Sequence, residues 1–389
     1  MSYSVIVVGG GIIGTSSAYY LSKAGADVTL LEAKDIASGT SGACDQHVLL
    51  QSKKPGPVLE LAVEGKKLYP ELEAELHTDL EYRSGGGIIL MESEKERELL
   101  TQKVAQMQEY GVDVTTLSAQ GAKEKQPGLA NHILGSTWCP DEGKVNSFNV
   151  CFSMAQAAER LGATIRLGSP VTELITEQDR VIGVKVHGEK LYADAVLVTA
   201  GVWTPALTKP LGIDVPIVPR RGQILVSEKI PPFLKRSVLS YAYIAAKGKN
   251  TAEPSDGADA AGVGLVMEQT ESGNLLIGGS REFVGFNTET TSEVTSAIGQ
   301  AAVKTFPELA NVRIIRSFSG LRPNTPDGKA IMGPVENIPG LYLAAGHEGD
   351  GIALAPITGK LMADVISGQH SSVDIRPFLF DRFQNSGVV

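Results

Sequence analysis

The sequence contains few cysteines, no basic tract and no long apolar run, and each absence excludes a class of protein. Its 389 residues include only 3 cysteines, Cys44, Cys139 and Cys151, and none stands in a CxxC pair. An odd number of widely spaced cysteines argues against a disulfide framework, a zinc site or an iron–sulfur cluster, so we expect no metal. The formal net charge is −9 without any cluster of lysines and arginines, so nucleic acid is not the expected partner.

The chain also lacks the signals of membrane insertion and secretion. No apolar run approaches the roughly 20 residues of a membrane span, and no basic region precedes the short apolar run at the N-terminus. We therefore expect no transmembrane segment and a cytoplasmic location. Glycine, by contrast, is abundant at 43 residues, which predicts many tight turns and close backbone approaches. A chain of this length forms two domains or one large interleaved unit.

The first 32 residues carry the most informative pattern. The β-branched run 5–8 predicts a buried strand, 15–23 a helix, and 28–31 a second strand. A G-x-G-x-x-G sequence joins the first strand to the helix, and its glycines are Gly9, Gly11 and Gly14. Because strand, glycines, helix and second strand all agree, this segment predicts a dinucleotide-binding βαβ unit.

Each part of this unit suits a dinucleotide. Gly9 makes the turn, Gly11 lets a pyrophosphate approach the backbone, and Gly14 lets the helix pack closely on the strand. The helix N-terminus offers N–H groups and the positive end of its dipole to the phosphates. Glu32, 18 residues after Gly14, can accept hydrogen bonds from the adenosine ribose, and its charge disfavours NADP. This unit alone does not separate NAD from FAD.

Later stretches favour FAD. Segment 37–47 is rich in small and hydroxyl residues, as expected around a second cofactor portion or in a simple polar loop. A strand at 195–199 ends in Ala200 and Gly201. A strand at 341–344 runs into a glycine-rich turn, and a helix begins near residue 352 and continues past Pro356 at least to residue 366. The N-terminus of that helix could face the flavin edge that becomes negative on reduction, which argues against an NAD-dependent dehydrogenase.

With these pieces in order, the chain resembles the D-amino-acid oxidase (DAO) family of FAD-dependent oxidoreductases. That family includes glycine oxidases, sarcosine oxidase subunits, D-amino-acid dehydrogenases and hydroxyproline dehydrogenases. The resemblance is nearest to the branch of bacterial D-hydroxyproline or D-proline dehydrogenases and hydrogen cyanide synthase subunits. The matching pieces are VIVVGGGIIG…LLE, SGTSGA, AVLVTAGVWT, PRRGQILV, GNLLIGGSREFVGF, GLRPNTPDGKAIMGP and GHEGDGIALAPITGK.

The resemblance implies an α/β fold. A Rossmann-like FAD-binding domain of the glutathione-reductase type would be interleaved with an α+β substrate domain that carries an antiparallel sheet. The apolar face of 57–76 predicts a helix in the first domain, and ILVSE and GNLLIGGS read as strands of the second. Segment 247–264 looks like an insertion, which is a surface loop, an active-site lid or a docking segment. The FAD domain would comprise 1–83, 145–215 and 320–389, and the substrate domain 84–144 and 216–319.

The resemblance also implies which residues contact FAD. We expect non-covalent binding, because Ala43 and Gly320 stand where some relatives attach FAD through Cys or His, although Cys44 is one position away. The expected cofactor-binding residues are Gly9, Gly11, Ile12, Ile13, Gly14, Glu32, Ala33, Thr40, Ser41, Gly42, Val171, Ala200, Gly201, Trp203, Gly346, Gly349, Asp350, Gly351 and Ile352.

Arg322 is the candidate substrate anchor. It stands in GLRPNTPDGKAIMG, where Pro323 and Pro326 are expected to stiffen a turn that presents it. A guanidinium can hold a carboxylate with two parallel hydrogen bonds, and the resemblance assigns that role to the arginine of the matching RP pair. The alternative is that Arg322 pairs with an acid such as Asp327.

Six further positions are candidates with open alternatives. Tyr241 and Tyr243, expected on a strand, either bind the substrate carboxylate or pack in the core. His347 either contacts the flavin or caps the following helix, and His47 could approach the other flavin face; for both, a purely structural histidine is the alternative. Glu348 and Asp350, also beside that helix start, suit its dipole.

The expected reaction is oxidation of the C–N bond of a small amino acid or cyclic secondary amine. Candidate substrates are D-proline, D-hydroxyproline, glycine, sarcosine or another D-amino acid. The Cα hydrogen would leave as hydride to flavin N5, giving an imine and then a 2-oxo acid, or a pyrroline from a cyclic amine. Oxidase and dehydrogenase both remain open. The alternative is a flavoprotein subunit that serves mainly electron transfer or assembly in a heteromeric dehydrogenase, with partner subunits as electron acceptors.

Overall fold

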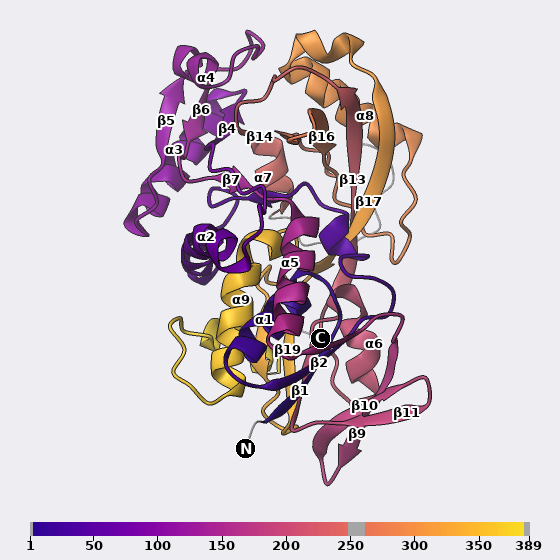
Figure 1. Ribbon diagram of the computed structural model, residues 1–389. Helices are drawn as coiled ribbons and strands as arrows, with labels where there is room; N and C mark the ends of the chain where they lie inside the picture. Colours follow the sequence, from indigo (N-terminus) through magenta and orange to yellow (C-terminus); the bar gives the residue numbers. More distant parts are fainter. Residues whose placement is uncertain (1–2, 248–260, 385–389) are drawn as a thin grey trace.

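The fold is described from a computed structural model, in which residues 3–247 and 261–384 are described. The lower half of the molecule in Figure 1 is built on a six-stranded sheet. The five strands from β19 to β8 run parallel and β18 runs antiparallel at one edge. Across the sheet the strands are β18 (Ile331–Pro334), β19 (Leu341–Ala345), β12 (Ala195–Val198), β1 (Ser4–Val8), β2 (Asp27–Leu31) and β8 (Thr164–Arg166).

Both faces of this sheet are covered, which explains its continuous apolar runs. On one face Val5 and Val7 pack against helices; on the other, Ile6 and Val8 pack against a small antiparallel sheet. The helices are α1 (Ile12–Lys23), α2 (Pro57–Leu76), α5 (Ser147–Arg160) and α9 (Gly351–Ile366), and the small sheet is β9 (Val171–Glu177), β10 (Arg180–Val186) and β11 (Glu189–Tyr192).

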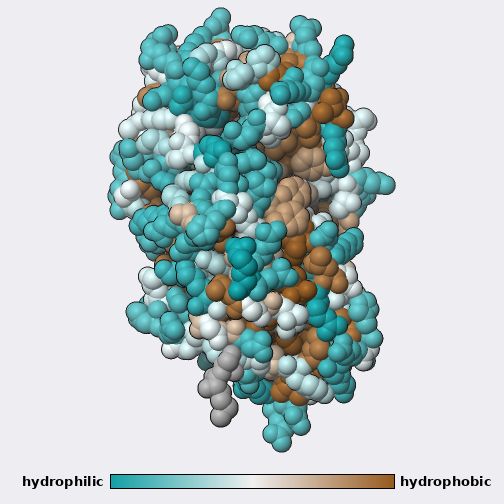
Figure 2. Space-filling model, viewed as in Figure 1, coloured by the Kyte–Doolittle hydropathy of each residue, from teal (hydrophilic) through white to brown (hydrophobic). Residues whose placement is uncertain are grey.

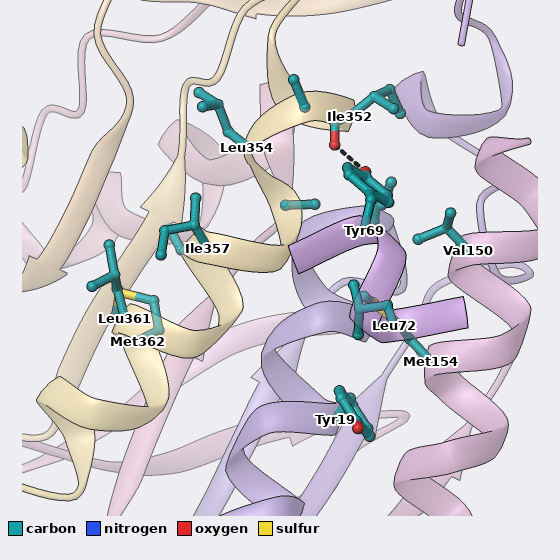
Figure 3. Close-up of a cluster of buried hydrophobic side chains, with 14 of the residues drawn as sticks. Tyr19, Tyr69, Leu72, Val150, Met154, Ile352, Leu354, Ile357, Leu361 and Met362 are labelled. Atoms are coloured by element: carbon teal, nitrogen blue, oxygen red, sulfur yellow. Dashed lines mark hydrogen bonds between the residues drawn. The ribbon is translucent and has the colours of Figure 1, made fainter. Parts of the chain in front are cut away.

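The helices form a dense core beside the sheet. In Figure 3, Tyr69 and Leu72 of α2 lie between Ile357 of α9 and Met154 of α5. The Tyr69 hydroxyl donates a hydrogen bond to the carbonyl of Ile352, in the first turn of α9 (Figure 3). This core therefore fixes the start of α9, which lies at the site described below.

The upper half in Figure 1 is an eight-stranded sheet, antiparallel except where β14 pairs with β4. In order its strands are β17 (Ile314–Asn324), β13 (Val218–Lys229), β16 (Asn274–Gly278), β15 (Val266–Gln269), β14 (Ser237–Ser240), β4 (Gly87–Met91), β6 (Gly135–Trp138) and β5 (Thr115–Ser118). The other described helices are α3 (Glu94–Glu109), α4 (Ala119–Lys125), α6 (Thr204–Thr208), α7 (Tyr241–Lys247) and α8 (Ser292–Thr305). A two-stranded ribbon pairs β3 (His47–Val48) with β7 (Gly143–Lys144).

The predicted α/β class is confirmed, with corrections in detail. The helix predicted at 57–76 has these bounds in α2, whereas α1 begins at Ile12 rather than at residue 15 because the glycine turn itself caps it. The strand expected around Tyr241 is wrong, since α7 begins there. Arg322 lies within strand β17 and not on a turn, because the chain pairs with β13 as far as Asn324.

The domain division remains a proposal. All strands of the six-stranded sheet come from the ranges assigned to the FAD domain, which supports it. Strand β17 continues across the proposed boundary between residues 319 and 320. Most of the proposed insertion 247–264 lies outside the described residues.

Among the described residues no helix is long and apolar enough to cross a membrane. Figure 2 shows that hydrophilic side chains cover most of one face of the molecule, with a band of hydrophobic ones toward its right side. Large exposed apolar residues in the described chain include Phe148, Phe152, Trp203 and Phe286.

Candidate active site

A cavity of about 500 Å³ lies where the two large sheets meet. From the six-stranded sheet it is lined by the ends of β1, β2, β12 and β19, and from the eight-stranded sheet by β13 and β17. Segments far apart in the chain therefore share one site, at the carboxyl ends of parallel strands where α/β sheets commonly bind ligands.

The glycine turn after β1 has the close approaches that its sequence predicts. A Cβ on Gly14 would lie 1.8 Å from the carbonyl oxygen of Gly9 and 2.6 Å from Oγ1 of Thr199. Gly9 has a φ of +113°, a conformation that L side chains rarely adopt. Both glycines are therefore required for α1 to sit against the strand, with Gly9 and Gly11 on the cavity wall.

The N-terminus of α1 meets the cavity. Gly11 is its N-cap, and no side chain caps the helix from that position. Ser41 Oγ accepts a hydrogen bond from the Ile12 N–H at 2.9 Å, while Thr40 Oγ1 donates to the Leu321 carbonyl at 2.6 Å. The hydroxyl-rich segment thus ties α1 to β17, and both hydroxyl residues line the cavity.

Glu32 stands at the end of β2 on the cavity wall. Its carboxylate accepts hydrogen bonds from the N–H of Gly10 at 2.6 Å and of Lys34 at 2.7 Å, which holds it in place. A carboxylate has about four acceptor positions, so ribose hydroxyls can still donate to it. The backbone N–H groups at this helix N-terminus can donate to the phosphates of FAD, and the Glu32 carboxylate can accept from its ribose hydroxyls. The glycines let the phosphates approach the backbone, so these residues fit FAD.

A second helix N-terminus meets the same cavity. Gly349, Gly351 and Ile352 at the start of α9 line it. Gly346 has a φ of +76°, and a Cβ there would lie 2.6 Å from a methyl carbon of Thr325. The dipole of this 16-residue helix favours negative charge in the cavity, as expected for the flavin edge.

Asp350 does not line the cavity, although it was expected to contact the cofactor. Its carboxylate is bound by Lys247 at 2.6 Å and by Lys53 at 2.8 Å. Burial would raise its pKa, but the two lysines outweigh burial and hold the pKa below its usual range. Asp350 therefore anchors the α9 start to α7 and to the segment after β3.

Arg322 projects from β17 over Gly222 of β13. A Cβ on Gly222 would lie 2.0 Å from Nη1 of Arg322, so only glycine leaves room for the guanidinium. Nη1 donates to the Ser280 carbonyl at 2.9 Å, and Arg322 lines the cavity. No ion pair of Arg322 with a carboxylate is found in the described ranges, and Asp327 instead pairs with Arg382 at 2.8 Å.

Two further buried arginines adjoin this site, and sequence reasoning missed both. Arg281 forms an ion pair with Glu348, and Arg220 lies 3.7 Å from the same carboxylate. Burial would raise the pKa of Glu348, but Arg281, Lys247 and Arg322 outweigh it and lower that pKa. Glu348 lines the cavity, and its φ is +48°. Its place in the structure is therefore not explained by a favourable interaction with the helix dipole alone.

The two candidate tyrosines differ in the structure, since one lines the cavity and the other does not. Tyr243 lines the cavity, and the Arg281 guanidinium carbon lies 4.7 Å from the centre of its ring. Burial, followed by the charge of Asp45, raises the Tyr243 pKa to about 12, so the phenol stays protonated. Tyr241 does not line the cavity and packs against the apolar cluster of Leu239 and Ile89.

His347 lines the cavity with its ring 5% exposed. One ring nitrogen lies 3.1 Å from Oγ1 of Thr358 in α9. Burial lowers the His347 pKa to about 4, so this imidazole is neutral at physiological pH. It is a hydrogen-bonding group and not a cation.

The positions considered for covalent attachment also meet at the cavity. A Cβ on Gly320 would lie 2.4 Å from the carbonyl oxygen of Ala43, and both residues line the wall. Cys44 lines it too, with Sγ 3.2 Å from the Ser41 carbonyl. Burial raises the Cys44 pKa to about 12, which disfavours the reactive thiolate.

Most of the expected site residues lie on this one cavity. Gly14, Gly42 and Asp350 of the cofactor set, and Tyr241 of the catalytic set, do not line it. Sequence reasoning did not assign Asp45 or Gly222, which do, because a lone acid or glycine in a loop or strand carries no local signal. It gave Glu348, which also lines the cavity, only an interaction with the helix dipole. The expected residues that line the cavity are Gly9, Gly11, Ile12, Ile13, Glu32, Ala33, Thr40, Ser41, Val171, Ala200, Gly201, Trp203, Tyr243, Arg322, Gly346, His347, Gly349, Gly351 and Ile352.

The chain is similar to known proteins over nearly its whole length. The family model DAO, described as FAD dependent oxidoreductase, matches residues 4–365. The chain is 27% identical to the hydrogen cyanide synthase subunit HcnC of Pseudomonas protegens, over 99% of this chain and 97% of that protein. It is 30% identical to a glycine oxidase of Bacillus licheniformis, over 94% and 93%. The crystal structure of glycine oxidase from Geobacillus kaustophilus superposes with a TM-score of 0.87 at 25% identity, over 98% of this chain and 99% of that one.

Proposed function

This chain belongs to the DAO family of FAD-dependent oxidoreductases, and on that premise we propose that it oxidises the C–N bond of a small amino acid or cyclic secondary amine held by its carboxylate. The enzyme class, an FAD-dependent oxidoreductase of the amino-acid oxidase or dehydrogenase type, follows from the family. The substrate class is the proposal, and D-proline, D-hydroxyproline, glycine and sarcosine are its candidates.

Arg322 carries this proposal. Arg322 lines the cavity and is 9% exposed as a residue, and its guanidinium donates to a backbone carbonyl through Nη1. No carboxylate of the described residues forms an ion pair with it, so a substrate carboxylate is the ligand that its fork geometry suits. Gly222 and Gly349 lie against the Arg322 side chain, and a Cβ on Gly222 would collide with the guanidinium.

A second charge in the cavity suits the amino group. Asp45 lines the cavity, and Arg322 lies close enough to help lower the Asp45 pKa. Burial would raise that pKa, but His47 first and then Arg322 and Arg281 lower it to about 2, so Asp45 is a carboxylate at neutral pH. A cation and an anion across one cavity match the two charges of an amino-acid zwitterion.

The chain's own task is therefore binding and orientation. When bound, FAD supplies the chemistry by accepting hydride at N5, which leaves an imine that water converts to a 2-oxo acid and ammonia, or a pyrroline from a cyclic amine. Arg322 fixes the carboxylate, and so the direction of the Cα–H bond. Tyr243 lines the cavity, and the Arg281 guanidinium lies against its ring.

The test is reduction of the bound flavin without oxygen in wild type, R322A and R322K. The panel is glycine, sarcosine, D-alanine, D-proline, cis-4-hydroxy-D-proline and L-proline, and bleaching of the band at roughly 450 nm reports reduction. We expect R322A to need about 10- to 100-fold more substrate for half-maximal reduction, because hydrogen bonds to charged groups contribute about 1.5–3 kcal/mol. R322K should fall between the two, since it keeps the charge but loses the fork.

Arg316 offers a matched control, since it is an exposed arginine on the same strand. R316A should behave as wild type in both flavin content and half-maximal substrate concentration. Equal half-maximal concentrations for R322A and wild type would refute the role of Arg322. Re-oxidation on admitting air would mark an oxidase, and persistence of the bleached state a dehydrogenase.

The second candidate is a flavoprotein subunit of a heteromeric dehydrogenase. Its support is the 27% identity to HcnC, a protein named as a subunit of hydrogen cyanide synthase. A flavin-loaded wild-type protein that no substrate of the panel reduces would favour this candidate over independent catalysis.

A further inference from the structure

Two cavities are separated by a few buried titratable groups. Asp45 and His47 line the main cavity. Glu268, on β15, lines a second hollow of about 60 Å³ whose wall includes the exposed residues Arg83 and Lys235, so this hollow opens at the protein surface. The side chains of His47 and Glu268 are each 3% exposed. These two side chains therefore connect the interior cavity to the surface hollow.

The three groups stand in a row. His47 Nδ1 lies 3.5 Å from Oδ1 of Asp45, and His47 Nε2 lies 3.4 Å from Oε2 of Glu268. Both ring nitrogens and Glu268 Oε2 are buried without a hydrogen-bond partner. Buried polar atoms are usually hydrogen-bonded, so three unpaired ones in a row call for an explanation. Both gaps would reach hydrogen-bond length with shifts of a few tenths of an ångström.

The fold fixes this row through strand pairing. β3 pairs with β7 so that His47 stands opposite Lys144. Lys144 lines the surface hollow and donates to the carbonyl of Gln269, the residue after Glu268. The histidine and the glutamate are thus brought together from segments more than 200 residues apart.

We propose that Asp45, His47 and Glu268 form a proton relay from the substrate's amino group to the surface hollow. The inference deepens the proposed function and rests on it, since the amine is the proton source. An amino acid binds as its ammonium form, and its nitrogen must lose a proton before the C–N bond can be oxidised. The relay gives that proton a path to solvent.

Each transfer in the relay breaks one bond to hydrogen and forms another. An ammonium N–H proton passes to a carboxylate oxygen of Asp45. From there it passes to His47, whose cationic ring has first given its Nε2 proton to Glu268 Oε2 and then flipped, so that the free nitrogen faces Asp45. Glu268 releases its proton to water in the hollow, and His47 is again the cation. The net change is one proton moved from the amine to solvent, with no redox change in the relay.

The electrostatics favour the transfer from Asp45 to His47, because the His47 pKa lies well above that of Asp45. Burial would lower the His47 pKa, but the charge of Glu268 and then Asp45 raise it to about 9. Burial raises the Glu268 pKa to about 7, partly offset by His47 and Lys144. A carboxyl that titrates near neutrality beside solvent suits the outlet of a relay. A positive amino group arriving at Asp45 disfavours the imidazolium and so favours proton release through Glu268.

Other charged groups lie near Asp45, His47 and Glu268 and also affect their pKa values. Lys144 and Glu271 lie beside Glu268, and Arg281 and Arg322 act on Asp45. The buried Glu142 also raises the His47 pKa, and Cys44 adjoins Asp45. Arg83, Lys235 and Arg236 add positive charge around the outlet hollow.

The first test is the pH dependence of anaerobic flavin reduction, with the substrate that reduces the wild type. Glu271 supplies the matched control, because it pairs with Lys144 at 3.2 Å beside the same hollow but does not line it. Between about pH 6 and 9, we expect the wild-type rate to rise through about pH 7, and the E271Q rate to rise at a somewhat lower pH because the charge of Glu271 helps raise the Glu268 pKa. We expect E268Q to lack this rise and to react about tenfold more slowly at about pH 8.

The second test needs no turnover. 2-Aminoisobutyrate carries both charges of an amino acid but no Cα hydrogen, so it cannot be oxidised. An indicator dye in weak buffer reports protons released when it binds the FAD-loaded protein. We expect release from wild type to be greatest near about pH 7, release from E271Q to be greatest at a somewhat lower pH, and this maximum to be lost in E268Q. Isobutyrate, which lacks the amino group, should cause no such release.

H47Q keeps both carboxylates and removes the link, so it tests the relay if E268Q does not fold. Its reduction should also be slower and lose the rise near pH 7. The relay would be overturned if wild type, E268Q and H47Q had identical pH profiles and identical proton release. The three side chains would then form only a structural ion-pair network. No proton release from wild type would overturn it as well. Failure of the proposed function differs from these results, since then no amino acid would reduce the wild-type flavin at all.

Discussion

The contrast between two helical glycines gives the sharpest prediction from this structure. Gly14 in α1 and Gly299 in α8 are both helical, and both become better helix formers as alanine by about 1 kcal/mol. A Cβ on Gly14 would lie 1.8 Å from a backbone oxygen, whereas the nearest atom to one on Gly299 is 4.0 Å away. The same substitution should therefore have opposite effects at the two sites.

In G14A the clash is with backbone, which cannot rotate away. Overpacking costs typically about 1–3 kcal/mol and more where backbone must move, so the net change should be a loss of about 1–3 kcal/mol. Because α1 must shift away from Gly9 and Thr199, its N-terminus moves from the place where it faces the phosphates. We therefore expect G14A to lose most of its FAD as well as stability.

The assay is chemical unfolding together with the ratio of flavin to protein absorbance after gel filtration. G299A should unfold at a higher denaturant concentration, with unchanged flavin content. A G14A protein that keeps full flavin and a wild-type midpoint would refute the steric argument, as would a loss of stability in G299A.

Two further predictions concern groups beside α9. Y69F removes the hydrogen bond from the Tyr69 hydroxyl to the buried Ile352 carbonyl, so we expect a loss of about 1–2 kcal/mol of unfolding free energy; an unchanged urea midpoint would contradict this. His347 has a folded pKa of about 4, below the usual value of 6.5. Between these two pH values the unfolded chain binds a proton that the folded protein does not, so stability falls as the pH is lowered through this range. H347Q should reduce the slope of unfolding free energy against pH there, and equal slopes for the two proteins would show that His347 is not the cause.

The dinucleotide half of the site could be predicted from sequence because its parts are local. Gly9, Gly11 and Gly14 lie within one turn, and Glu32 follows at the end of the next strand. Turn geometry and helix packing fix what each of these residues can do, whatever the rest of the chain contributes. The helix at 57–76 was predictable for a similar reason, since an apolar face with a proline at its start is a local signal.

Other sequence expectations failed where tertiary pairing outweighed local signals. Two prolines and several glycines predicted a turn at Arg322, but pairing with β13 continues the strand to Asn324. The resemblance implied that Asp350 contacts the cofactor, yet its carboxylate pairs with Lys53 and Lys247 and does not line the cavity.

The sequence by itself determined that this chain forms a parallel α/β unit with a dinucleotide cradle, because short-range periodicity and glycine placement specify such a unit. Only the tertiary structure decided which charges share the cavity between the two large sheets. Arg322 meets Gly222 across β17 and β13, and His47 meets Glu268 across segments that the sequence keeps far apart. Such pairs arise from the register between distant strands, and a lone acid, histidine or glycine carries no local pattern that reveals its partner.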